Sequence, residues 1–245
     1  MKTIRPLACL ALLLAAALPA GADTVLKIAN HVDEMTMMGQ TTPAQDTTYE
    51  YWFGDDAIRY DMDTTSIVIR VDEKLAYFIN HEEKQYSEMK LPIDFDQMVG
   101  PEMAQMMQQM MSGSTKVTPL GNEGSYGGHA CDFYQVDLTM GMMQSAMKLC
   151  LADDLPVDYA KFKELMVAQS EMAPSQEWMK ELSKLEGFPV RSETQTTVMG
   201  KTFGSWQELE GVEKKDAPAG HYGPPAGYKN VEFNPMGQMH QGRKR

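Results

Sequence analysis

Methionine gives this sequence its most distinctive chemistry. There are 22 methionines in 245 residues. They are concentrated at Met35/Met37/Met38, Met98–Met111, Met140–Met147 and Met236/Met239, the last pair beside His240. Thioether sulfur is a soft ligand that favours Cu(I) and Ag(I), and exposed methionine reacts with oxidants. Because methionine is also flexible and polarizable, it fills cores and lines adaptable apolar surfaces. Soft-metal binding, oxidant scavenging and apolar packing are therefore all open to this chain.

The spacing of one methionine cluster favours packing. Five methionines between Met103 and Met111 recur at i, i+3, i+4, i+7 and i+8. On a helix these positions form one apolar stripe, whereas a soft-metal site needs only two or three sulfurs. We therefore favour core packing or the lining of an apolar-ligand site, keep soft-metal binding as the alternative, and assign no metal ligand and no cofactor.

Cys131 and Cys150 form the second candidate site. Cys9 lies in an N-terminal segment that we expect to be removed, which leaves an even pair of the kind that forms disulfides in exported proteins. The segments 130–138 and 146–152 look like neighbouring antiparallel strands joined by a loop at 139–145, with Cα spacings that suit a disulfide. The alternative, a redox or metal site, lacks a C-x-x-C spacing and a histidine at ligand spacing.

Catalytic signatures are missing from the sequence. The five histidines are scattered, and neither an H-E-x-x-H pair, a G-x-S-x-G elbow nor a phosphate-binding glycine-rich loop occurs. Acidic pairs such as Asp55-Asp56 and Asp153-Asp154 fall at expected turns, where solvated surface explains them. We therefore predict a protein that is not an enzyme.

Residues 1–22 have the three parts of a secretory signal peptide: the basic Lys2 and Arg5, the apolar run Leu7–Leu18, and small residues ending at Ala22. The apolar run is too short to cross a bilayer, which takes about 20 residues. The position after Ala22 is an aspartate, so the pattern does not indicate a lipid anchor. We expect cleavage near Ala22 and release of the protein into a bacterial periplasm.

The chain that remains after cleavage is acidic. Loss of Lys2 and Arg5 changes the formal net charge from −12 to −14. Such a surface repels nucleic acid and anionic membranes, and no later apolar run is long enough to span a bilayer. We expect one domain over 23–233 and a disordered basic tail over 234–245.

Strands dominate the expected fold. Apolar and polar residues alternate in several segments separated by short turns, which indicates an antiparallel meander. The expected strands are Thr47–Phe53, Thr65–Val71, Leu75–Ile79, Gln85–Met89, Thr115–Leu120, Cys131–Leu138, Met147–Ala152, Phe188–Met199 and Thr202–Val212. From Asp216 onward the chain is rich in proline and glycine, so we expect no ordered strand there.

Two helical regions are expected. Pro101 suits the first position of a helix that ends near Met111. A second region runs from Asp158 to Glu186, is interrupted at Pro174 and ends before Gly187. Each region has an apolar face that must pack on another surface, and the sheet can supply one.

Several stretches together resemble the bacterial family called domain of unknown function 4412. They are residues 36–42, Leu75–Met89, Pro101–Met107, Gly127–Leu138, Glu186–Val190, Ala217–Gly220 and Pro225–Tyr228. The family in turn is similar to the lipoprotein-localisation factors, which implies a half-open antiparallel sheet with helices across its concave side. The resemblance supplies no binding residues.

We therefore expect an α+β fold in which a curved antiparallel sheet, a half-open barrel, carries helices 101–111 and 158–186 packed across its concave face. We hypothesise a periplasmic binding protein for a lipid, an acyl chain or a lipoprotein. The expected ligand-binding residues, for which ordinary core packing is the competing interpretation, are Met106, Met107, Met110, Phe162, Met166, Trp178 and Leu182. The alternatives are a methionine-rich Cu(I) or Ag(I) binder and an envelope scaffold or stress protein.

Overall fold

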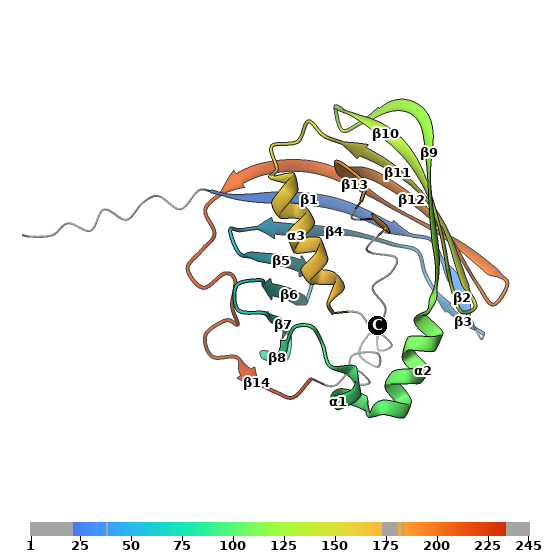
Figure 1. Ribbon diagram of the computed structural model, residues 1–245. Coiled ribbons are helices and arrows are strands. Elements are labelled where there is room, and N and C mark those ends of the chain that lie inside the picture. The colour runs from blue at the N-terminus through green and yellow to red at the C-terminus, as the bar shows by residue number, and fades with distance from the viewer. Residues whose placement is uncertain (1–21, 38, 173–180, 183, 234–245) are drawn as a thin grey trace, which may run out of the picture.

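Most of the described chain is β-strand. The computed structural model describes residues 22–37, 39–172, 181–182 and 184–233 (Figure 1). Its strands are β1 (Asp23–Val32), β2 (Met35–Met37), β3 (Gln40–Thr42), β4 (Gln45–Phe53), β5 (Ala57–Met62), β6 (Thr65–Arg70), β7 (Leu75–Asn80), β8 (Gln85–Lys90), β9 (Gly113–Tyr126), β10 (His129–Met140), β11 (Met143–Ala152), β12 (Phe188–Val198), β13 (Lys201–Lys215) and β14 (Lys229–Asn230). The helices are α1 (Phe95–Val99), α2 (Pro101–Met111) and α3 (Tyr159–Ser170).

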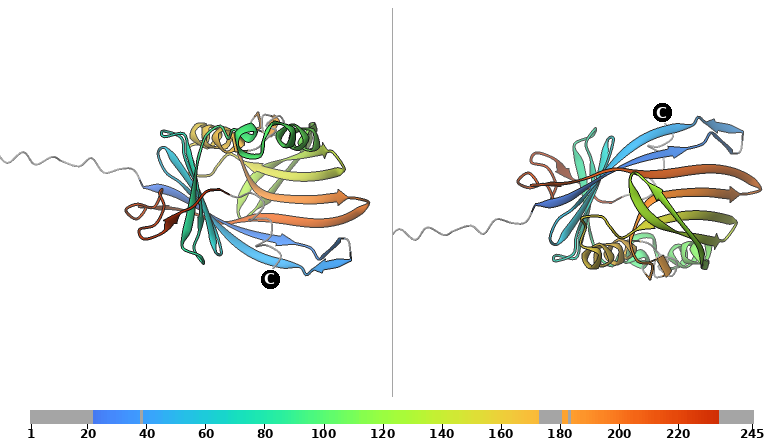
Figure 2. Two further views of the ribbon diagram at one scale, coloured as in Figure 1. Left: turned by 90° about the horizontal axis from the view of Figure 1, so that it is seen from below. Right: turned by 90° about the horizontal axis from the view of Figure 1, so that it is seen from above.

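Twelve of these strands form one open sheet. The strand order is β14-β8-β7-β6-β5-β4-β1-β13-β12-β11-β10-β9, and β2 pairs only with β3. Neighbouring strands are antiparallel except β14, which runs parallel to β8. Because β14 and β9 are edges that do not meet, the sheet is not closed into a barrel. Figure 2 shows β5–β8 edge-on while β9–β13 extend across the view, so the sheet bends strongly between the two groups.

Strand β1 lies at the centre of the sheet and was not predicted. It pairs with β4 on one side and β13 on the other. Val25, Leu26 and Ile28 are all buried. Because adjacent residues are buried on both faces of the sheet, the segment lacks the alternation that marks a half-exposed strand. Strand β5 was missed for a similar reason, since it begins with three consecutive buried residues.

The predicted meander is present in β5–β8. Each strand pairs with the next in antiparallel register. Alternate side chains pack into two clusters on opposite faces of the sheet. Ile58, Ile69 and Ala76 belong to one cluster, and Val68, Tyr77 and Ile79 belong to the other.

The long strands include the predicted cysteine hairpin. Strands β10 and β11 are antiparallel neighbours, as the sequence indicated, but they run to Met140 and resume at Met143, so the turn is shorter than the expected loop at 139–145. Cys131 and Cys150 have Cα atoms 5.3 Å apart and sulfur atoms placed for a disulfide. A disulfide between these two cysteines, which are 19 positions apart, would contribute roughly 3 kcal/mol to stability.

The helices agree with the sequence in part. Helix α2 has the predicted bounds, and α3 covers the first half of the region predicted over 158–186. Helix α1 was missed; Asp94 caps it by accepting a hydrogen bond from the Gln97 amide at 3.0 Å. The segments 1–21, 173–180 and 234–245 lie outside the described residues, and with them the signal peptide and the basic tail. None of the described helices is long and apolar enough to cross a membrane.

The methionine stripe on α2 differs from its expected role. Met103 and Met106 are 47% and 46% exposed, and among the described side chains of this helix the buried one is Ala104. Helix α2 packs chiefly on α1. The stripe was expected to pack on the sheet, and α1 was not predicted.

Candidate functional site

An apolar cavity of about 500 Å³ lies between α3 and the sheet. The strands contribute Ile28, Tyr51, Phe53, Ile58, Met147, Leu149, Leu151, Phe188, Pro189, Ser192 and Gln207. Helix α3 contributes Tyr159, Phe162, Lys163, Met166, Gln169 and Ser170, and the segments that follow it contribute Met172, Leu182, Leu185 and Gly187. A volume of this size is typical of small-molecule sites, which span roughly 300–1,000 Å³.

The strand side of the cavity is lined by alternate residues of β4 and β11, whose side chains project from one face of the sheet. Met147, Leu149 and Leu151 of β11 are two residues apart and therefore project from the same face of the sheet. Tyr51 and Phe53 of β4 do the same, with their rings stacked at 6.2 Å. Because β11 and β4 are separated by three strands in the sheet order, only a bent sheet brings these side chains around one space.

The helix side is set by α3 and its attachments. Phe162 packs edge-on against Phe53 of β4 and Phe188 of β12, with ring centroids 5.7 Å and 5.2 Å away. At the start of the helix the Tyr159 hydroxyl accepts a hydrogen bond from the Leu155 amide at 3.1 Å and donates one to the Ala152 carbonyl at 3.2 Å. Helix α3 is thereby fixed to the end of β11.

The far end of α3 is also attached. The Ile93 amide donates a hydrogen bond to the Glu171 carbonyl at 3.0 Å. Ala168 is buried in the cluster that contains Ile58 and Leu91. With both ends held, α3 forms a defined wall rather than a loose cover.

The cavity walls carry no negative charge from tyrosine. Burial raises the pKa of Tyr51 to about 12 and also raises the pKa of Tyr159. Both phenols are therefore neutral at physiological pH. The wall is apolar with a few neutral polar groups and the ammonium group of Lys163.

The structure brings together only some of the predicted ligand-binding residues. Phe162, Met166 and Leu182 line the cavity. Met106 and Met107 lie on α2 and are not among the lining residues. Trp178 and the side chain of Met110 fall outside the described residues. The strand residues of the lining were missed, although alternation in the predicted strand 147–152 and in 47–53 already placed them on single faces.

A second cluster of polar side chains lies on the other face of the meander. Arg59 donates hydrogen bonds to both Asp61 oxygens at 2.8 and 2.9 Å and to the Ser66 hydroxyl at 2.9 Å. The Ser66 hydroxyl also bonds Asp61, and its oxygen lies 2.6 Å from Nε2 of His81. Nδ1 of His81 lies 3.0 Å from the Tyr228 hydroxyl. We call these five residues the polar network.

The polar network does not have the geometry of a Ser-His-Asp triad. In a triad the histidine bridges the serine and the carboxylate, whereas here Asp61 contacts Ser66 and Arg59. Ser66 is also 1% exposed, so its hydroxyl cannot reach a substrate in this structure. The network instead satisfies polar groups that would be costly to bury alone.

The neighbours of Asp61 and His81 shift the pKa values of both side chains. Burial opposes ionisation of Asp61, but hydrogen bonds from Arg59 and Ser66 outweigh it and lower the pKa of Asp61. Burial, helped by the positive charge of Arg59, lowers the pKa of His81. The network therefore favours an ionised Asp61 and a neutral His81.

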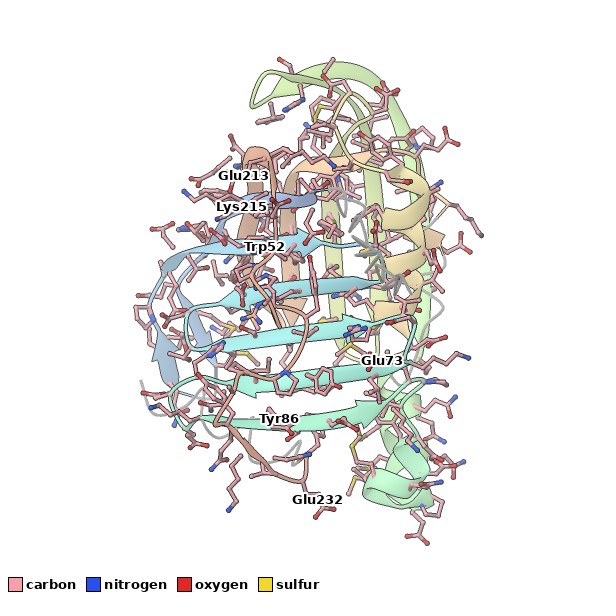
Figure 3. The ribbon with its side chains drawn as sticks, turned by 90° about the vertical axis from the view of Figure 1, so that its left-hand side faces the viewer. Trp52, Glu73, Tyr86, Glu213, Lys215 and Glu232 are labelled. Atoms are coloured by element: carbon pink, nitrogen blue, oxygen red, sulfur yellow. A yellow bond between two sulfur atoms is a disulfide. The ribbon has the colours of Figure 1, made fainter. Side chains whose placement is uncertain are left out.

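The network anchors the segment 216–233, which we call the strap. Figure 3 shows the strap crossing the sheet from near Trp52 to Glu232. Arg59 donates to the His221 carbonyl at 2.8 Å, and Tyr222 donates to Asp23 at 2.9 Å. The ring of Tyr222 lies so close to Gly54 that a Cβ there would come within 2.8 Å of it.

The strap ends in β14, contrary to the expectation of no ordered strand after Asp216. Lys229 and Asn230 pair with Gln85 and Tyr86 of β8. The Val231 amide continues this contact with a hydrogen bond to the Tyr86 carbonyl at 2.8 Å. Tertiary contacts with the edge strand thus order a segment whose proline and glycine content predicted a loop.

No group of three or more histidine, cysteine, aspartate or glutamate side chains in the described part of the chain is arranged to hold a metal ion. The cavity is instead suited to an apolar guest, because aromatic and aliphatic side chains form most of its wall.

The fold and the cavity define a class: a β-rich protein whose large open antiparallel sheet partly encloses an apolar space. The chain belongs to the family described as a domain of unknown function, DUF4412, whose model matches residues 33–228. The matched region contains the polar network and, apart from Ile28, the residues that line the cavity, whereas the whole of β1 precedes it. No curated protein matches the chain.

Proposed function

We propose that this protein is a non-enzymatic periplasmic carrier that holds one acyl chain in the cavity between α3 and the sheet. The apolar cavity of about 500 Å³ is the observation that carries the proposal. In this proposal α3 lies across the concave face of the sheet, in the manner of the lipoprotein-localisation factors. The signal peptide predicted over 1–22 would deliver the protein to the compartment where free lipids must cross water.

The lining supports an acyl chain over a compact polar ligand. Phe53, Phe162 and Leu151 offer aromatic and aliphatic surface on opposing walls. Burying a methylene group in such surroundings is worth about 0.8 kcal/mol, so a long chain gains affinity along its whole length. Met147 and Met166 add flexible side chains that adapt to chains of different shape.

Filling the cavity should abolish this binding. Met166 lines the cavity, so the larger side chain in Met166→Trp would occupy the space of the ligand. The adjacent Val167 is 51% exposed and faces away from it, which makes Val167→Trp a matched control. In titrations with the fluorescent fatty acid cis-parinaric acid, we expect Met166→Trp to weaken binding at least about tenfold, or 1.4 kcal/mol, and Val167→Trp to leave it within about twofold.

Two outcomes of these titrations would contradict the proposal. Equal affinities of both variants and the unmodified protein, with circular dichroism showing an unchanged fold, would mean that the fatty acid does not occupy this cavity. Failure of the unmodified protein to bind the probe at all would remove the carrier function.

A further inference from the structure

Lys163 is the one charged side chain among the described residues that line the cavity. This is unexpected from composition, because the chain has 34 acidic and 22 basic residues. The surface as a whole repels anions, while the cavity wall presents an ammonium group and no carboxylate among its described residues.

The helix sets the position of this lysine. Tyr159, Phe162, Lys163 and Met166 follow helical spacing and share the face of α3 that lines the cavity. The neighbours at i±3 and i±4 are Ala160, Met166, Tyr159 and Val167, none of which is acidic. Glu164 is adjacent in sequence but exposed, and side chains at i and i+1 do not face each other.

Lys163 therefore has no counter-charge in the described part of the chain. It is partly buried, and no ion pair of Lys163 occurs among the described residues. Its side chain borders the apolar lining of the cavity, where an opposite charge interacts more strongly than it would in bulk water. A ligand that brings its own negative charge would provide the missing partner.

We propose that the ligand is a fatty acid whose carboxylate pairs with Nζ of Lys163 while its chain occupies the apolar part of the cavity. This assignment rests on the proposed carrier function and adds the head group that the site selects. Chain burial supplies most of the affinity, and the charged pair orients the ligand and discriminates against neutral lipids.

The experiment compares palmitic acid with its neutral analogue, hexadecanol, by competition with bound cis-parinaric acid at pH 8, where a carboxylate is ionised. Lys163→Met keeps the length of the side chain and removes its charge. Lys201→Met, at an exposed position of β13, is the control for loss of one positive charge.

We expect the unmodified protein and Lys201→Met to bind palmitic acid about tenfold more tightly than hexadecanol, as one charge-assisted hydrogen bond allows. In Lys163→Met the two affinities should become equal because only that for the acid falls. Equal affinities in the unmodified protein, or an equal loss for both ligands in Lys163→Met, would overturn the head-group assignment and leave the carrier function standing. Binding of neither ligand to the unmodified protein would overturn both.

Discussion

Replacing Leu26 by alanine is expected to destabilise the protein by about 4 kcal/mol. Leu26 is 0% exposed and belongs to the core cluster that also contains Ile28, Phe188 and Leu209. Its strand, β1, joins β4 to β13 and so connects the meander to the long strands. The cost combines the lost transfer free energy with the cavity left behind, which for leucine to alanine in a core is about 3–5 kcal/mol.

Urea denaturation followed by circular dichroism measures this effect. Lys27→Ala on the same strand is the control, because Lys27 is exposed and its ion pair with Glu210, at 3.0 Å, lies at the surface. Such a pair is worth about 0–1 kcal/mol. A loss for Leu26→Ala no larger than that for Lys27→Ala would contradict the central position of β1.

Replacing Arg59 by methionine should cost about 2–3 kcal/mol and loosen the strap. Removing one partner of a buried ion pair costs about 3–5 kcal/mol of stability. We expect a smaller loss here because the Asp61 side chain is 31% exposed. The variant also deprives Ser66 and the His221 carbonyl of a donor. Urea denaturation gives the loss of stability, and limited proteolysis should show earlier cleavage within 216–233.

Two comparisons make the Arg59 result specific. Arg70→Met removes an arginine from the surface pairs with Asp72 and Glu73 and should cost under about 1 kcal/mol. In the double variant Arg59→Met/Asp61→Asn, the uncompensated carboxylate charge is removed as well, which should recover part of the stability lost in Arg59→Met. Strictly additive effects, or a strap as resistant to proteases as before, would show that the network does not hold the strap.

The sequence predicted best what depends on local pattern. Alternation located β4 and β6–β8, proline and glycine signals located both ends of α2, and the cysteine pair identified β10 and β11 as neighbours. These features are set by residues close together in the chain.

What depends on distant partners was not predictable in the same way. Strand β1 owes its place to pairing with β13, where Asp23 lies opposite Lys215, and a strand buried on both faces has no alternation to reveal it. The polar network likewise joins His81 to Tyr228, which lies 147 positions further along the chain.

The candidate site shows the same division. Helical spacing identified the face of α3 that carries Phe162 and Met166, and these residues line the cavity. The same reasoning identified a face on α2, but periodicity says which side of a helix is apolar and not what covers it. Met103 and Met106 remain half exposed, and the main contacts of α2 are with α1, the helix that precedes it in the chain.

The two faces of the sheet are covered differently. On one face the strap crosses the sheet (Figure 3) and is held to it by contacts with the polar network. On the other face α3 and the long strands leave an apolar space open.

The most direct test of the central claim is to find where a bound acyl chain lies. The protein would be irradiated with a fatty acid that carries a diazirine in its chain, and the labelled residues identified by mass spectrometry. We predict labels in the peptides that contain Leu149–Leu151 and Phe162–Met166, lost when unlabelled palmitic acid is in excess. Labels confined to α2 or to the edge strand β9, or labels that palmitic acid does not displace, would contradict the account.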